Sequence, residues 1–252
     1  GRAPRDAQLV LDLALDQARA GLDREALELL ERPGLEGVDG SLPLVHYCAA
    51  WLAGRLGEVE AAARHRRAAA RTSPDRCFPA RLEEIAVLEA AMAAGPGDAR
   101  APFYLGNLLY DRGRREEAIA HWERAAALEG SNPVAWRNLG IARFNVRRDP
   151  AGALAAYRRA READPSDARL LYEHDQLLER TGAAPAERLA ELEAHPGLVA
   201  RRDDLSVELC ALLLQAGRPE EALRRLAGRR FQPWEGGEGL VLEQHTRARL
   251  AL

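Results

Sequence analysis

Hydrophobic residues recur every three or four positions along most of the chain, in short stretches that glycine and proline interrupt. Near the start this spacing joins Leu9, Leu13, Leu27 and Leu30, and near the end it joins Leu205, Leu209, Leu212, Leu223 and Leu226. Such spacing marks one face of an α-helix. Residues 21–23, 54–57, 111–113 and 217–219 each lie between two of these stretches, as turns between helices do. Because no stretch alternates like a half-buried strand, the pattern predicts an all-α chain.

The helical pattern also repeats along the sequence. Gly106 and Gly140 each follow a leucine directly, and their separation of about 34 residues is typical of helical repeats. Ala118, Trp122 and Ala125 recur as Ala153, Tyr157 and Ala160, at a spacing one residue longer than that of the two glycines. We expect the one extra residue to lie in the turn at residues 147–150, where added length costs little. Since a single helix pair cannot bury its apolar face, such pairs are expected to stack on one another.

These positions resemble the tetratricopeptide repeat, a helix–turn–helix unit of about 34 residues. The unit from Pro133 carries the family's residues at Trp136, Leu139, Gly140, Ala153, Tyr157 and Pro165. The preceding unit keeps Leu105, Gly106, Ala118 and Trp122, but Pro102 stands where the family has tryptophan. The resemblance implies a right-handed helix–turn–helix solenoid, for which the spacing along the chain predicts about 13–14 helices.

The repeat divides the chain into four segments of one continuous solenoid. Divergent repeats are expected in residues 1–75 and two well-matched repeats in residues 99–166. Divergent repeats and a terminal helix are expected in residues 167–252. The interval from Ala61 to Ala118 exceeds one repeat by the length of a helix and a turn. We therefore expect an unpaired extra helix within residues 76–98.

A narrower resemblance concerns three short segments, residues 81–85, 172–177 and 231–239. They are similar to the repeat tail of large bacterial proteins in which a β-rich domain of unknown function, itself similar to sugar mutarotases, precedes the repeats. This resemblance implies that a domain outside the chain holds any chemistry.

Composition excludes several kinds of catalysis. All 36 basic residues are arginine, so no lysine can hold a phosphate or form a Schiff base. The six histidines are scattered singly without metal-ligand spacing, which predicts no metal and no cofactor. His174 and Asp175 are adjacent on a helix and point about 100° apart, so a solvated or capping histidine is favoured over a catalytic base. We therefore expect that the chain is not an enzyme.

Charge and apolar content predict a soluble chain, and the cysteines place it in the cytoplasm. The net charge is −3 and acids flank each arginine cluster, which favours solvated helix faces with local ion pairs over nucleic-acid binding. No uncharged apolar run is long enough to span a membrane and no signal-peptide pattern opens the sequence, so no membrane partner is expected. Cys48, Cys77 and Cys210 are widely spaced, as reduced structural thiols are.

In the tetratricopeptide family the first helix of each pair lines a concave groove. The corresponding face here carries Phe103, Asn107, Tyr110, Arg137, Asn138, Ile141, Phe144, Arg169, Tyr172 and Glu173. Asn107, Asn138 and Arg169 match the members that grip a peptide's terminal carboxylate, although Phe103 and Glu173 stand where basic residues are expected. A groove for another peptide, or for a segment of the parent chain, is favoured. It stays open that the asparagines only bond neighbouring helices.

The sequence therefore predicts a non-enzymatic scaffold that binds a protein or peptide segment. Aromatic residues would be buried by the ligand. Asn107 and Asn138 would fix the ligand backbone from neighbouring pairs about 10 Å apart and hold nothing else in place. The alternative is an accessory helical domain of a larger carbohydrate-active enzyme. If the asparagines are not the binding surface, residues 231–234 are the next candidate.

Overall fold

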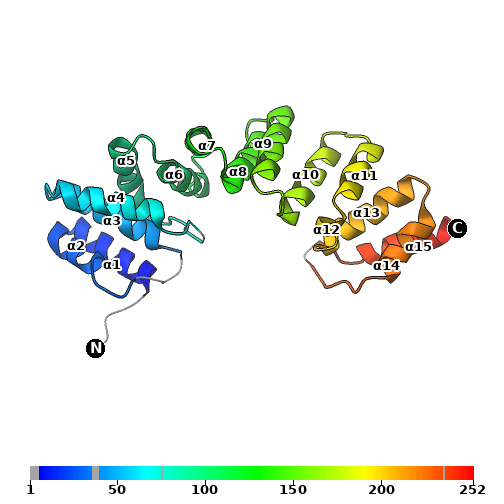
Figure 1. The fold of residues 1–252 in the computed structure, drawn as a ribbon, viewed down its shortest axis with the longest axis horizontal. Coiled ribbons are helices and arrows are strands. Elements are labelled where there is room, and N and C mark those ends of the chain that lie inside the picture. The colour runs from blue at the N-terminus through cyan, green and yellow to red at the C-terminus, as the bar shows by residue number, and fades with distance from the viewer. Residues whose placement is uncertain (1–5, 36–39, 75, 235) are drawn as a thin grey trace. The chain divides into compact units, whose positions relative to one another are not determined.

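The computed structural model describes residues 6–35, 40–74, 76–234 and 236–252, which contain fifteen helices and no strand (Figure 1). They are α1 (Ala7–Arg19), α2 (Asp23–Leu30), α3 (Leu42–Arg55), α4 (Val59–Arg71), α5 (Glu83–Ala94), α6 (Arg100–Asp111), α7 (Arg115–Leu128), α8 (Pro133–Asn145), α9 (Pro150–Ala163), α10 (Ala168–Arg180), α11 (Pro185–Ala194), α12 (Pro196–Val199), α13 (Asp203–Gln215), α14 (Pro219–Ala227) and α15 (Leu240–Leu250). The all-α prediction is confirmed. The count exceeds the expected 13–14, in part because α12 is a single turn.

The chain divides into two compact units, residues 1–142 (unit 1) and residues 143–252 (unit 2), and each is described by itself. Within unit 1, α1 packs on α2, α3 on α4 and α6 on α7. Within unit 2, α10 packs on α11 and α13 on α14, and α9 packs on α10, the first helix of the following pair. Predicted helix pairs are therefore present in both units. The handedness of a superhelix and the predicted segment boundaries stay predictions.

One kind of turn joins the two helices of most pairs. After α6, Gly113 has a φ of 78°, and the next N–H, of Arg114, bonds the Leu109 carbonyl five residues back at 2.9 Å. A glycine with a positive φ, followed by an N–H that bonds the carbonyl five residues back, also comes after α1, α3, α10 and α13. A left-handed residue here satisfies the free carbonyls of the helix end, and glycine takes that conformation without a steric penalty. The glycines noted in the sequence thus reverse the chain between paired helices.

The turn between α8 and α9 differs. Arg148 takes the left-handed conformation at a φ of 55°, and the Asp149 N–H bonds the Arg143 carbonyl six residues back at 2.9 Å. The Asp149 carboxylate then accepts the Gly152 N–H at 2.8 Å and caps α9. The longer closure accommodates the additional residue, which confirms its predicted place in this turn.

A single helix, α5, lies in the interval where an extra one was expected. It packs against α3 and α6. Val87, Leu88 and Met92 carry the buried face. The approach to α5 is fixed by Glu84, whose Oε2 accepts the backbone N–H groups of Ala80 and Arg81 at 2.7 Å each.

Each unit has its own core. In unit 1, Tyr47 and Tyr104 are fully buried with ring centroids 6.3 Å apart, and the Tyr47 hydroxyl donates to Asp98 at 2.6 Å. In unit 2 the core consists mainly of leucines, among them Leu171, Leu192, Leu205, Leu209, Leu212 and Leu213. Because a leucine side chain contributes about 1.5–3 kcal/mol when buried, these clusters supply the main driving force for stacking the helices.

The three cysteines lie inside these cores and form no disulfide. Burial raises the pKa of the Cys77 thiol to about 12 and that of the Cys210 thiol to about 11. These groups stay protonated near neutral pH, which confirms the prediction of structural thiols.

Candidate functional site

A close contact between two helices of unit 1 builds the candidate site. Gly106 on α6 faces Trp122 on α7, and a Cβ atom at Gly106 would lie 2.5 Å from both Cδ1 and Nε1 of the indole. Real side-chain atoms do not approach so closely, so only glycine admits the ring here. Trp122 is 3% exposed. The missing side chain thus lets the indole N–H reach the surface of α6.

Three side chains from three helices meet at that point. The Trp122 Nε1–H donates to Asn107 Oδ1 at 3.0 Å, and Asn138 Nδ2 on α8 donates to the same oxygen at 3.1 Å. Because the indole N–H can only donate, it fixes which end of the Asn107 amide is oxygen. The expected spacing of about 10 Å between the two amides is wrong, because the side chains bridge the gap between helices and bond each other.

We call Asn107, Asn138, Trp122 and Tyr110 the asparagine face. The Tyr110 ring lies 5.2 Å from the Trp122 ring, centroid to centroid, and is half-buried. Within the described residues, Asn107 Nδ2 and Asn138 Oδ1 have no hydrogen-bond partner. Both asparagines are half-buried. The face therefore presents one oriented amide donor and one oriented amide acceptor beside an aromatic pair.

The other predicted residues of unit 1 are less available. Phe103 is 7% exposed and packs against Tyr104 at a centroid distance of 5.6 Å, so little of its ring is left for a ligand. Arg137 and Ile141 on α8 are half-buried, and Arg137 already has an interaction partner. Phe103 thus contributes to the core more than to a binding surface.

Unit 2 holds the remaining predicted residues. Phe144 and Tyr172 are half-buried, and burial raises the pKa of the Tyr172 hydroxyl. Exposed Arg169 donates from Nε to Glu173 at 2.8 Å, and the Tyr157 hydroxyl donates to the same carboxylate at 3.1 Å. Arg169 therefore offsets the negative charge of Glu173, and the guanidinium is already paired.

The surroundings of His174 contradict the expectation that this histidine is solvated or caps a helix. His174 is 5% exposed, and its Nδ1 lies 3.5 Å from Glu191 Oε1, which Arg161 also binds. The expectation is wrong because α10 packs against both α9 and α11, so a residue that a lone helix would expose is covered. The hydrogen bond with His174, together with Arg161, lowers the pKa of Glu191 to about 2.

Asp175 lies in a second ionic cluster. It is 1% exposed and accepts two bonds from Arg188, at 3.0 and 2.8 Å. Glu208 and Glu179 contact the same guanidinium at 2.5 and 3.0 Å. Burial raises the pKa of Asp175 against the opposing effect of Arg188. The sequence does not reveal this cluster, because Arg188 and the acids that surround it come from three helices, and no local spacing joins the arginine to the acids.

Two arginine clusters have local partners as predicted, whereas Arg64, in the cluster at residues 64–67, pairs with Glu31, 33 residues away, at 3.1 Å. Arg114 pairs with Glu117 at 2.5 Å and Arg159 with Glu162 at 2.9 Å, each three residues apart on a helix surface. These exposed pairs bear out the interpretation as solvated faces.

Among the residues described, no group of three histidine, cysteine or acidic side chains could hold a metal ion. In the same residues, no helix combines the length and the apolar character needed to cross a membrane.

Comparison with known proteins identifies the repeat at the candidate site. A family model of the TPR, or tetratricopeptide, repeat matches residues 106–146. This match confirms the wider resemblance. The stretch contains Gly106, Trp122 and both asparagines of the asparagine face. The narrower resemblance, to the repeat tail of large bacterial proteins, finds no support.

Several solved structures are similar to this chain. YrrB, described as a TPR protein with an unusual peptide-binding site, is 20% identical, with 65% of this chain and 81% of that chain covered and a TM-score of 0.49. The protein MamA is 15% identical over 84% of this chain and 96% of its own, also at 0.49. Pseudomonas aeruginosa pilF is 18% identical over 88% and 89%, at 0.46. At these identities and TM-scores the likenesses say nothing about what this chain binds.

Proposed function

We propose that this chain is a non-catalytic interaction module that binds an extended protein segment on the asparagine face. The observation that carries the proposal is the shared bond at Asn107 Oδ1, which orients two amides and leaves one donor and one acceptor unused. An extended backbone offers a carbonyl and an N–H in the same short interval. Asn107 Nδ2 would donate to that carbonyl, and Asn138 Oδ1 would accept that N–H.

The aromatic pair beside the amides supplies the apolar part of the contact. Tyr110 is half-buried and packs on Trp122, so its ring is held before a ligand arrives. Rigid aromatic groups lose little conformational entropy on binding. The ligand side chain next to the paired peptide bond would lie against Tyr110. Backbone pairing sets the position of the segment and leaves its sequence loosely defined.

A displayed library of random twelve-residue peptides, selected on the full chain, tests the proposal. The decisive variant is Asn138→Ala, and Asn145→Ala is its matched control because Asn145 is an exposed asparagine on the same helix. Selected peptides should bind Asn138→Ala about 3- to 10-fold more weakly, since one hydrogen bond is worth about 0.5–1.5 kcal/mol. They should bind Asn145→Ala unchanged.

N-methylation along a selected peptide gives a second measure. Methylating the N–H that Asn138 accepts should weaken binding, and that loss should disappear in Asn138→Ala. Equal binding of the peptides to both alanine variants would contradict the proposal, as would a library that yields no binders.

The alanine variants of the two asparagines should differ in their free energy of unfolding. Asn107→Ala leaves the Trp122 N–H, on a residue 3% exposed, without its acceptor, which should cost about 1–2 kcal/mol of unfolding free energy. Asn138→Ala leaves that bond intact and removes only its own bond to Asn107, between two half-buried amides, so it should cost about 0.5–1 kcal/mol. Because both amides bond other side chains, the expectation that they hold nothing else in place is wrong. Urea unfolding of both variants measures the difference, and equal losses would show that the indole bond is unimportant.

A further inference from the structure

A second candidate site lies near the C-terminal end of unit 2 and shares no residue with the asparagine face. A cavity of about 540 Å³ opens between the end of α14, the start of α15 and the segment that joins them. Its lining residues are Leu226, Ala227, Phe231, Gln232, Pro233, Trp234, Gly237, Glu238, Gly239, Val241, Leu242 and His245. The volume falls within the range of small-molecule sites, about 300–1,000 Å³.

The described residues on either side of position 235, up to Trp234 and from Gly237, are held in place before any ligand binds. The Asp203 carboxylate accepts the Gln232 N–H at 2.8 Å and the Arg229 Nε–H at 2.5 Å. The Gly237 N–H bonds the Trp234 carbonyl at 3.1 Å, and a Cβ atom at Gly237 would lie 2.0 Å from the indole. The ring therefore rests directly on the glycine backbone. Such pre-organisation lowers the entropic penalty of binding.

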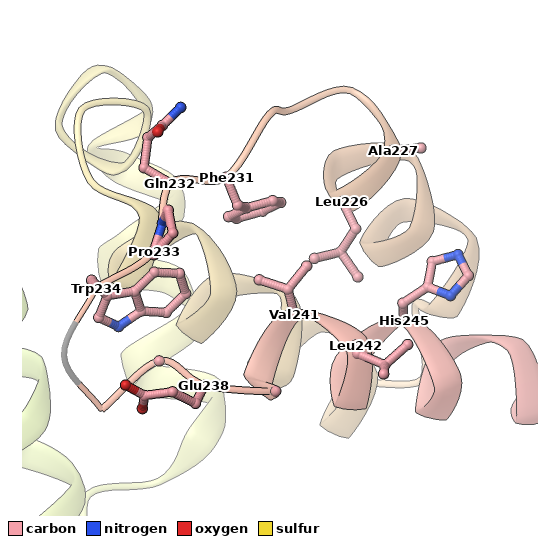
Figure 2. Close-up of a pocket in the computed structure, with 12 residues that line it drawn as sticks. Leu226, Ala227, Phe231, Gln232, Pro233, Trp234, Glu238, Val241, Leu242 and His245 are labelled. Atoms are coloured by element: carbon pink, nitrogen blue, oxygen red, sulfur yellow. The ribbon is translucent and has the colours of Figure 1, made fainter.

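The cavity wall is mostly apolar and aromatic. Figure 2 shows Phe231, Leu226 and Val241 turned toward one another, with Trp234 to one side and His245 to the other. No described side chain fills the space between them. The wall therefore suits a ligand with an aromatic or branched apolar body.

A charged side chain in the cavity lining indicates the chemistry of the polar end of the ligand. Among the described residues that line the cavity, Glu238 carries the only permanent charge, and it makes no ion pair there. Its carboxylate lies on the Trp234 side of the cavity (Figure 2). Arg229 stacks on Phe231 at 5.6 Å, but it lines a different pocket and is paired with Asp203. An indole face beside a free carboxylate favours a cation, which both groups attract.

We propose that this cavity binds a small organic cation, an ammonium group attached to an aromatic or branched apolar body. The apolar body lies against Phe231, Leu226 and Val241. The ammonium group lies over Trp234 and pairs with Glu238. This site is independent of the asparagine face and goes beyond the proposed peptide binding.

The test uses the ¹⁵N-labelled full chain and follows the indole N–H signals of its four tryptophans by NMR. The signal absent from Trp234→Phe identifies Trp234. Phenethyltrimethylammonium should shift that signal with a Kd of a few millimolar, as expected for about twelve heavy atoms. Phenethyl alcohol should bind about fivefold more weakly, and 3-phenylpropanoate should not shift the signal at equal concentration. N-acetyl-lysine amide, which stands for a protein side chain, should bind more weakly than the aromatic cation.

Glu238→Gln should weaken the cation about threefold to fivefold and leave the alcohol unchanged. Glu243→Gln is the matched control, because Glu243 is a nearby acid on α15 outside the cavity lining, and it should change neither. The proposal is overturned if the carboxylate binds as well as the cation, if Glu238→Gln leaves the cation unaffected, or if no probe shifts Trp234. Tighter binding of the lysine amide would overturn it in favour of a protein side chain.

Discussion

Replacing Gly106 by alanine tests the contact on which the asparagine face depends. The new Cβ atom would lie 2.5 Å from the Trp122 indole and 3.1 Å from the Ala118 carbonyl oxygen, so the ring or a helix must move. Overpacking of this kind costs about 1–3 kcal/mol. Displacing the indole also weakens its bond to Asn107, worth about 0.5–1.5 kcal/mol. Alanine gains about 0.5–1 kcal/mol over glycine inside a helix, so the net loss should be about 1–3 kcal/mol.

Gly54→Ala is the matched control. Gly54 also lies within a helix, α3, but its added Cβ atom would meet nothing within 4 Å, so only the helical gain of about 0.5–1 kcal/mol applies. Urea unfolding, followed by far-UV circular dichroism and indole fluorescence, gives both free energies. The two variants should differ by about 1.5–4 kcal/mol, with opposite signs relative to the unaltered chain. If Gly106→Ala is as stable as Gly54→Ala, the indole does not pack on Gly106 and the geometry of the asparagine face is wrong.

Two further predictions concern the ionic clusters of unit 2. Since the folded pKa of Glu191 is lowered from 4.5 to about 2, its stabilisation is present above pH 4.5 and lost as the pH falls toward 2. This stabilisation amounts to about 3 kcal/mol. The unfolding free energy of a Glu191→Gln variant, measured between pH 2 and 6, should therefore fall less steeply with acid than that of the unaltered chain. Parallel pH profiles of the two proteins would contradict the prediction. Arg188→Met should cost about 3–5 kcal/mol, because Asp175 and Glu208 lose their common cation, whereas adding Asp175→Leu to it should recover part of the loss in thermal or urea unfolding. A double variant no more stable than the single one would show that the buried charges are not the cause.

The sequence by itself determined the class of fold and the places where the chain turns. Apolar spacing of three or four residues and glycines between stretches are local features, and local conformational preferences decide helices and left-handed turns. The extra residue is predicted correctly at residues 147–150 for the same reason, since a loop absorbs length more easily than a packed helix. The repeat of Gly106 and Trp122 likewise indicates where helices approach closely.

Only the tertiary structure decided which polar side chains already have a hydrogen-bond or ion-pair partner. Spacing assigns Asn107 and Asn138 to one face, but only the packing of α6, α7 and α8 shows that they share one bonded oxygen with Trp122. Helical spacing fixes where a side chain starts and leaves its partner undetermined, because the partner comes from another helix. For the same reason the sequence predicts a solvated or capping His174, whereas His174 and its neighbour Asp175 are both buried against partners 13 residues away along the chain.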